Sequence, residues 1–268
     1  MPVGLGLLTP YIPSVHDDQM VYTTTGQRVP LVQTAEYACL RTAGVIDAGG
    51  RVDDIVRDWM TVLARADREV ILSIRAPGAP DPGTGDPVPY ERTMVICRHQ
   101  DRYLAMAARN GDDVVIGSVG ESSSLQGQVE LMTRTLVPAF GDGDPADIDG
   151  VNIPKTVLMQ AIQGGASADG TDGILAALRG LGVGEWDARV ITAATDASDS
   201  AMAVVTILDR LPQVVPYPRV LTVIDTEYGR ITICTTVAAD GVEWMSIWPT
   251  TPTALADDLA NFLAIPAL

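Results

Sequence analysis

His16 and His99 are the only two imidazoles in the chain, and they limit the acid–base chemistry that it can offer. His16 lies in a polar segment, and His99 lies in the turn Arg-His-Gln-Asp, which we expect at the tip of a hairpin. A solvated loop histidine is the ordinary interpretation of both. With only two histidines, far apart in sequence, we expect neither a multi-histidine metal site nor a Ser-His-Asp triad.

Three glycine- or serine-rich segments come close to catalytic or cofactor motifs without matching them. Residues 120–124 (GESSS) lack the last glycine of G-x-S-x-G and stand where a helix should begin, a position that favours serine as N-cap. Residues 164–173 (GGASADGTDG) contain no G-K-[ST], so they are not a phosphate loop. Residues 4–6 (GLG) are followed by no third glycine, as a dinucleotide site would require. We therefore predict no cofactor and no enzymatic activity.

The acidic stretch GDGDPADIDG, residues 141–150, has the composition of a calcium loop but not its pattern. An EF-hand loop needs glycine at its sixth position and glutamate at its twelfth. Counted from Asp142, these positions hold Asp147 and Ile153. We predict a solvated acidic turn before a helix near Ile153, and no metal site.

The 268 residues are 47% apolar and 19% charged, which is typical of a compact folded protein. The formal net charge is −16, from 18 Lys and Arg against 34 Asp and Glu, and no run of basic residues occurs. Nucleic-acid phosphates and anionic membranes are therefore excluded as partners. No window reaches the ~18 apolar residues of a membrane span, and the first residues do not resemble a signal peptide.

The cysteines lie far apart, each in an apolar stretch, at Cys39, Cys97 and Cys234. They form no C-x-x-C pair, and their number is odd. Buried, reduced thiols are the expected state. With no signal peptide predicted, this indicates a cytoplasmic protein.

Hydrophobic periodicity divides the first half into helices, four strands and a helix. Residues 1–13 predict a short strand and a loop, and Thr34 can cap a helix that ends near Gly44. The next helix would place one apolar stripe on the core: Ile55, Trp59 and Leu63. Strands are predicted at 69–75, 91–98, 102–109 and 112–117. The closing helix would bury Leu125, Val129, Met132 and Leu136.

The second half repeats this order. Short helices are predicted at 152–162, 171–183 and 184–197, with residues 164–173 as a flexible joint. Strands are predicted at 200–210, 218–227, 230–239 and 243–249. Thr251 can cap the last helix, with Pro252 in its first turn. This helix would bury Leu255, Leu259, Phe262 and Leu263.

The two halves also align without a gap at an offset of 130 positions, where Asn110-Gly111 meets Asp240-Gly241. Runs of antiparallel strands and separate helices argue for an α+β fold. We predict a central, largely antiparallel sheet with helical bundles, formed as a single domain over residues 1–268. Its quasi-symmetric halves would span about 1–140 and 141–268.

Two features of this arrangement point to a partner surface. Residues 76–89 join neighbouring strands with five prolines and three glycines, so they predict a long projecting loop that is either a partner-binding flap or without function. Trp244 and Trp248 share one strand face. They would pack against the final helix or form an aromatic surface for a partner.

The second half also resembles the EspG family. The similarity rests on Asp225-Thr226 and Gly229-Arg230, on the Gly241-x-x-Trp244 strand, and on the Pro249–Pro252 helix entry. Upstream segments at 40–75, 144–162 and 178–197 resemble family segments as well, so nearly the whole chain is covered. The family usually has a strand and a helix ahead of Val3–Pro13 and a Trp-containing tail, which implies a truncated chain or a smaller first subdomain here. An absent strand would leave a sheet edge open and favour a homodimer.

The resemblance implies a cytosolic chaperone of ESX (type VII) secretion in mycobacteria and their relatives. Such a protein binds the apolar tip of the PPE subunit of a PE–PPE heterodimer, prevents its aggregation and directs it to the cognate ESX system. The expected contact residues are Thr222, Ile224, Ile231, Ile233, Trp244, Trp248, Pro80 and Asp81. A homo-oligomeric scaffold and a small hydrolase are the alternatives.

Overall fold

A computed structural model describes residues 19–22, 25–85, 88–210 and 213–265. The strand expected within residues 1–13, and His16, lie outside this part. The helices are η2 (Leu31–Gln33), α1 (Ala35–Thr42), α2 (Asp54–Ala64), α3 (Leu125–Leu136), η3 (Val137–Phe140), α4 (Lys155–Gly180), α5 (Glu185–Ala193) and α6 (Pro252–Leu263).

The strands form a two-stranded sheet and a ten-stranded sheet. They are β1 (Met20–Tyr22), β2 (Arg28–Pro30), β3 (Arg68–Ala76), β4 (Tyr90–His99), β5 (Tyr103–Asn110), β6 (Asp113–Glu121), β7 (Val151–Pro154), β8 (Ala201–Asp209), β9 (Val215–Pro216), β10 (Leu221–Thr226), β11 (Gly229–Val237) and β12 (Glu243–Pro249). The predicted α+β class and antiparallel sheet are confirmed.

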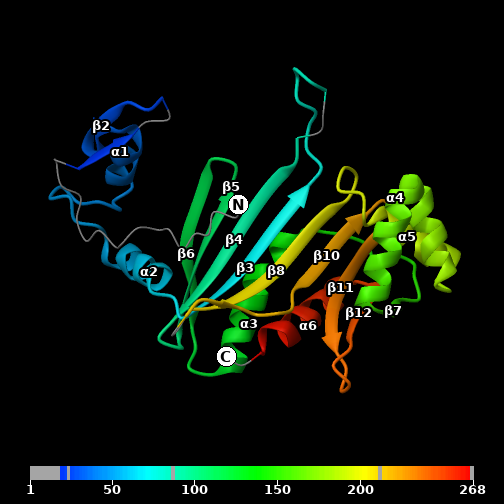
Figure 1. Ribbon diagram of the computed structural model, residues 1–268. Helices are drawn as coiled ribbons and strands as arrows, with labels where there is room; N and C mark the ends of the chain where they lie inside the picture. Colours follow the sequence, from blue (N-terminus) through cyan, green and yellow to red (C-terminus); the bar gives the residue numbers. More distant parts are fainter. Residues whose placement is uncertain (1–18, 23–24, 86–87, 211–212, 266–268) are drawn as a thin grey trace.

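The large sheet runs β6-β5-β4-β3-β8-β10-β11-β12-β7, and β9 extends β8 (Figure 1). Its two meanders, β3 to β6 and β8 to β12, meet where β3 pairs antiparallel with β8. Tight turns join the strands: Gln100 and Asp101 both have φ near +50°, and Gly111 and Gly241 have positive φ in the two hairpins that the offset of 130 superposes.

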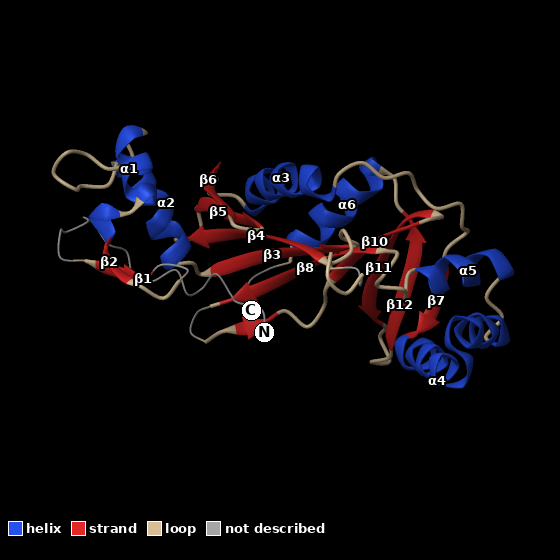
Figure 2. Ribbon diagram, turned by 90° about the horizontal axis from the view of Figure 1, so that it is seen from above, coloured by secondary structure: helices blue, strands red, loops and turns tan. Residues whose placement is uncertain are grey.

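Helices cover the two faces of the sheet unequally. Helices α3 and α6 lie side by side on one face, whereas α4 and α5 lie on the other (Figure 2). The core beneath α3 and α6 contains Val70, Leu72, Val205, Ile207, Leu255 and Leu259. A second core joins α4 and α5 to Ile224, Ile231 and Ile247, and a third joins α2 to Val95, Cys97, Ala105 and Ala107.

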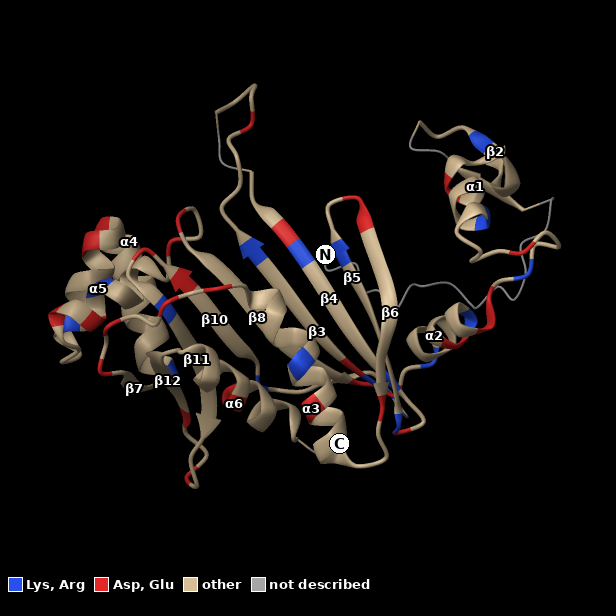
Figure 3. Cartoon of the chain, turned by 180° about the vertical axis from the view of Figure 1, so that it is seen from behind, with Lys and Arg blue, Asp and Glu red and all other residues tan. Residues whose placement is uncertain are grey.

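Two ion pairs lie at the seam between β3 and β8. The Arg68 guanidinium donates from Nε to Asp209 Oδ1 at 2.7 Å and from Nη2 to Oδ2 at 3.1 Å, and both side chains are buried. Next to it, Arg210 Nε lies 2.6 Å from Glu69 Oε1. Elsewhere, charged side chains gather at strand ends, loops and α4–α5, so most of the strand surface is uncharged (Figure 3).

Several predictions about individual elements were wrong. Ile55 is 61% exposed because α2 buries only its later turns, at Val62 and Leu63. Leu125 is 41% exposed as the first residue of α3. The helix expected at 152–162 begins later, after strand β7, which pairs with β12.

The segment 164–173 is helical rather than a flexible joint. Helix α4 breaks only at Asp169 and Gly170, where the dihedrals are non-helical and the chain reverses (Figure 1). Its two arms touch at Gly165 and Gly173. A Cβ built on Gly173 would lie 2.1 Å from Gly165 O, so only glycine allows this approach.

Candidate docking surface

The central strands carry a row of neighbouring side chains on the face opposite α3 and α6. Register places Ser73 beside Val204, Val204 beside Thr222, and Thr222 beside Ile233. Because side chains alternate along a strand, their neighbours Leu72, Val205 and Leu221 point to the core beneath α3 and α6.

No described helix covers the middle of this row, whereas at its borders Ile71 packs partly against the α2 core and Ile233 against the α4–α5 core. Ser73 is exposed, and Val204, Thr222 and Ile233 are half-buried, whereas Leu72, Val205 and Leu221 are at most 1% exposed. We call this surface the open face; it consists of Ile71, Ser73, Met202, Val204, Thr206, Thr222 and Ile233.

The open face combines aliphatic and hydroxyl side chains. Met202 is 40% exposed, an unusual state for a large apolar residue in a central strand. Ser73, Thr206 and Thr222 supply hydroxyl groups, and the exposed Arg75, which register places beside Met202, adds a positive charge at one end of the face. Such a surface can bury apolar side chains of a partner, and it holds no acid–base pair for a reaction.

The residues predicted for partner contact in β10 and β11 divide into two pairs. Thr222 and Ile233 belong to the open face. Ile224 and Ile231 share that side of the sheet but are 4% and 0% exposed, because α4 and α5 cover them. A partner could reach these two isoleucines only by displacing the helices.

The two tryptophans face the α6 side of the sheet. Trp248 Nε1 donates to Asp258 Oδ2 on α6 at 3.0 Å. Trp244 is half-buried on the same side of β12 and pairs with Pro154 of β7. Burial raises the pKa of the Asp258 carboxyl, and the hydrogen bond from Trp248 opposes that rise.

The predicted loop follows β3 and projects past the ends of the strands (Figure 1). Pro80 in this loop is exposed. Asp81 Oδ1 accepts hydrogen bonds from the backbone N–H of Gly83 at 2.7 Å and of Thr84 at 3.1 Å. Its side chain therefore folds the loop on itself in an Asx turn.

Sequence reasoning missed five residues of the open face: Ile71, Ser73, Met202, Val204 and Thr206. Their strands were predicted, and alternation placed them on one side of the sheet. That signal cannot say which side the helices leave uncovered. Only long-range packing decides it, because α4 and α5 come from a separate part of the chain.

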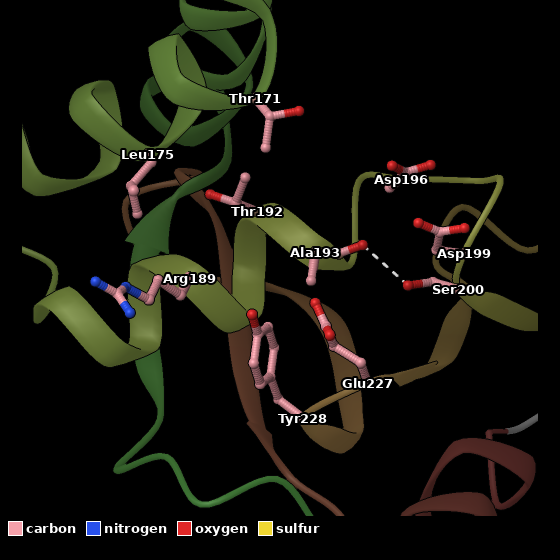
Figure 4. A pocket seen from close by; sticks show the side chains of 10 residues that line it. All are labelled: Thr171, Leu175, Arg189, Thr192, Ala193, Asp196, Asp199, Ser200, Glu227 and Tyr228. Carbon is pink, nitrogen blue, oxygen red and sulfur yellow. Dashed lines mark hydrogen bonds between the residues drawn. The ribbon is translucent and has the colours of Figure 1, made fainter.

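A cavity of about 190 Å³ lies between α4, α5 and the β10–β11 turn, away from the open face (Figure 4). It holds Ser200 with Asp196 and Asp199, the composition that a hydrolase would need. Ser200 Oγ donates to Ala193 O at 2.9 Å, and none of the residues that line the cavity is a histidine. The cavity therefore lacks the imidazole that activates the serine of a Ser-His-Asp triad.

The remaining candidates for chemistry are accounted for by structural contacts. Ser124 caps α3 through the Gly127 N–H, and His99 Nδ1 lies 2.7 Å from Arg65 O. Among the described residues, no group of three potential ligands could hold a metal ion, and no helix is long and apolar enough to cross a bilayer.

All three cysteines are free. Cys97 is buried, and its pKa is raised to about 12 mainly by desolvation, so its thiol is neutral at physiological pH. Cys234 is half-buried, with its pKa also raised by burial. Cys39 is exposed on α1, so the prediction that it is buried was wrong.

The Asp-Thr and Gly-Arg residues of the resemblance have structural roles. Arg230 pairs with Asp225 across the β10–β11 hairpin at 2.6 Å, and its guanidinium also donates to Phe140 O and Gly141 O. Gly229, at φ +115°, approaches the backbone of Ala146 too closely for any Cβ. The motif therefore fastens the acidic turn 141–150 to β11.

Comparisons with known proteins agree with this fold. The model of the EspG family matches residues 13–261. The ESX-2 secretion-associated protein EspG2, from two Mycobacterium tuberculosis strains, is 26% identical over 218 residues, which cover 76% of this chain and 73% of the relative.

A solved structure shares the fold: the Mycobacterium tuberculosis type VII secretion system chaperone EspG5 in complex with the PE25-PPE41 dimer. Its TM-score is 0.67 at 24% identity, and the match covers 88% of this chain and 87% of that one. The family model, the EspG2 relatives and the shared fold lead to one conclusion: this chain belongs to the EspG family.

Proposed function

We propose that this protein is a type VII secretion chaperone that binds a PE–PPE heterodimer through its PPE subunit. In this role it prevents aggregation of the heterodimer, directs it to the cognate ESX system and catalyses no reaction. We propose the cytoplasm as the place of action. The proposal rests on a largely apolar sheet face, whose middle no described helix covers, in a chain that shares its fold with EspG5.

The open face is suited to hold an apolar helix tip. Burial of apolar surface is worth about 25 cal/mol per Å². The strands satisfy their own backbone groups, so a partner's side chains can rest on Met202, Val204 and Ile233 without leaving donors unpaired. The loop at 76–89 starts three residues after Ser73, and α5 stands on the other side, so both can contribute to the contact.

Co-expression with a candidate PE–PPE pair tests the proposal. A complex that survives gel filtration is expected for the native chain. Met202→Lys should prevent it, because the substitution puts a second positive charge beside Arg75 within the contact. The matched control is Val114→Lys, which changes another exposed apolar residue, at the edge of the sheet.

Three results would contradict the proposal. The first is the lack of a complex with every PE–PPE pair of the source organism. The second is equal loss of binding in the Met202 and Val114 variants. The third is a dilution-resistant homo-oligomer that buries the open face over more than about 1,000 Å², which would indicate the scaffold alternative.

A further inference from the structure

A second apolar pocket lies on the other side of the sheet, beneath the base of the 76–89 loop. Its volume is about 390 Å³. Leu72, Ile74, Met94 and Ala108 form its floor, and Ala139 of η3 contributes one wall. Val115, which also lines the pocket, is 56% exposed, so the helices of this face leave the pocket uncovered.

Arg92 lies at the pocket and makes no ion pair with any described residue, although the chain has almost twice as many acidic as basic side chains. Its Nε is shielded from solvent and has no hydrogen-bond partner. The guanidinium lies over the Tyr90 ring, 5.7 Å from its centroid. A buried donor without an acceptor costs free energy, which an incoming carboxylate would recover.

The second half of the chain contains a counterpart of this site. Tyr217-Pro-Arg219-Val-Leu221 repeats the order of Tyr90-Glu-Arg92-Thr-Met94. Arg219 lies over the Tyr217 ring at 5.4 Å, as Arg92 does over Tyr90. The strand partners correspond too, because Leu221 pairs with Cys234 as Met94 pairs with Ala108.

The counterpart is filled by the chain itself. The last turns of α6 place Phe262 edge-on to Tyr217 and Ile265 against the same core. Asp258, one turn before Phe262, lines the same cavity as Arg219, although its carboxylate accepts from Trp248 Nε1, and about 170 Å³ remains. In the first half, η3 turns away after Ala139, so the site at Arg92 keeps its larger volume.

We infer that the Arg92 pocket binds the C-terminal end of a partner protein's helix with the chemistry of residues 258–265, which are the last turns of α6 and the two residues after it. Such a helix carries a carboxylate, an aromatic side chain four residues later and a branched aliphatic residue three residues after that. The apolar pair fills the floor, and the carboxylate accepts hydrogen bonds from Arg92. This site lies on the opposite face from the open face, and the inference does not depend on the proposed function.

A synthetic peptide with the sequence of residues 251–268 serves as the probe, titrated into the full chain and followed by methyl NMR. Shifts are expected at Ile74, Met94 and Val115. Arg92→Gln should weaken binding about tenfold, as expected for a hydrogen-bonded charge pair. Ala108→Phe should abolish binding by filling the pocket, and Asp113→Asn should strengthen it by removing the acid at the rim.

Controls separate this site from its alternatives. Arg75→Gln, which removes a charge from the other side of β3, should leave the affinity unchanged, and the peptide with Asp258→Asn should bind the native chain about tenfold more weakly. Binding that is insensitive to Arg92→Gln and Ala108→Phe would mean that the peptide replaces α6 at its own site, and the inference would be wrong. It would also be wrong if the peptide failed to bind while decanoate bound, since the occupant would then be a small amphiphile.

Discussion

Arg230 connects parts of the chain that are far apart in sequence. Its side chain is 2% exposed, pairs with Asp225 at two points and donates to two carbonyl groups at the end of the first half. Asp225 remains 39% exposed. The hydrogen bonds from Arg230 to the two carbonyl groups, rather than its ion pair with Asp225, therefore contribute most of the stability that Arg230 provides.

Arg230→Gln should lower the free energy of unfolding by about 3 kcal/mol, because it leaves buried carbonyl groups and one carboxylate without a donor. Urea denaturation followed by circular dichroism measures the change. Arg51→Gln removes an exposed pair with Asp47 and should cost less than about 0.5 kcal/mol. Equal effects of the two variants would show that Arg230 makes only a surface contact.

Asp258 makes the stability of α6 depend on pH. Its pKa is raised in the folded state by burial, so the folded protein holds this proton more tightly than the unfolded chain does. The carboxylate therefore opposes folding increasingly as pH rises above its ordinary pKa, and the effect is complete above the raised value. At neutral pH the buried charge is a net cost.

Asp258→Asn should raise the thermal midpoint at pH 7, since the amide is neutral and its oxygen can still accept from Trp248 Nε1. The difference in thermal midpoint between the variant and the native chain should decrease on acidification. It should vanish at a pH where Asp258 is protonated in both the folded and the unfolded state. Thermal melts of both proteins across this range measure it, with Asp112→Asn in the exposed β5–β6 turn as the control. A lower midpoint at pH 7 would mean that the charge-assisted hydrogen bond outweighs burial.

The helical hairpin of α4 is the element that sequence reasoning described least well. Glycine-rich composition favours a joint. The glycines are instead required by the approach of two helical arms, a contact that composition does not reveal. Strands β3 to β6, β8 and β10 to β12 were predictable, because alternation and turn residues are local signals. The open face was not predictable, because the helices that border it pack through distant contacts.

Gly173→Ala should destabilise the hairpin by several kcal/mol, because its Cβ would overlap the Gly165 backbone. Gly164→Ala is the matched variant one position from that contact. No atom lies within 4 Å of its added Cβ, so it should stabilise the helix by up to about 1 kcal/mol. Hydrogen exchange of α4 amides measures both effects, and a similar effect of both variants would contradict the close approach.

At the scale of the whole molecule, we propose that residues 1–268 form one domain whose halves, about 1–140 and 141–268, cannot fold alone. Pairing of β3 with β8 supports this, as do the adjacent helices α3 and α6. Residues 1–140 alone would expose the β3 edge and the face of α3 that contacts α6.

Each half produced separately should therefore give the narrow amide NMR spectrum of an unfolded or molten chain. An equimolar mixture should recover dispersed signals, because the missing strand and helix are then supplied in trans. A folded spectrum for residues 1–140 alone would contradict the single-domain proposal and indicate two independent units.

The ion pairs between β3 and β8 have a consequence during synthesis. The ribosome synthesises the first meander before the second. The edge of β3 is therefore unpaired for a time, while other nascent chains are present. Arg68 and Glu69 accept as neighbour only a strand with an acid and a base in the reverse order, as Asp209 and Arg210 provide. A foreign strand, or a shift by two positions, would trap unmatched ions in a dry interior. The two ion pairs thus disfavour pairing of β3 with any strand other than β8, or with β8 in another register.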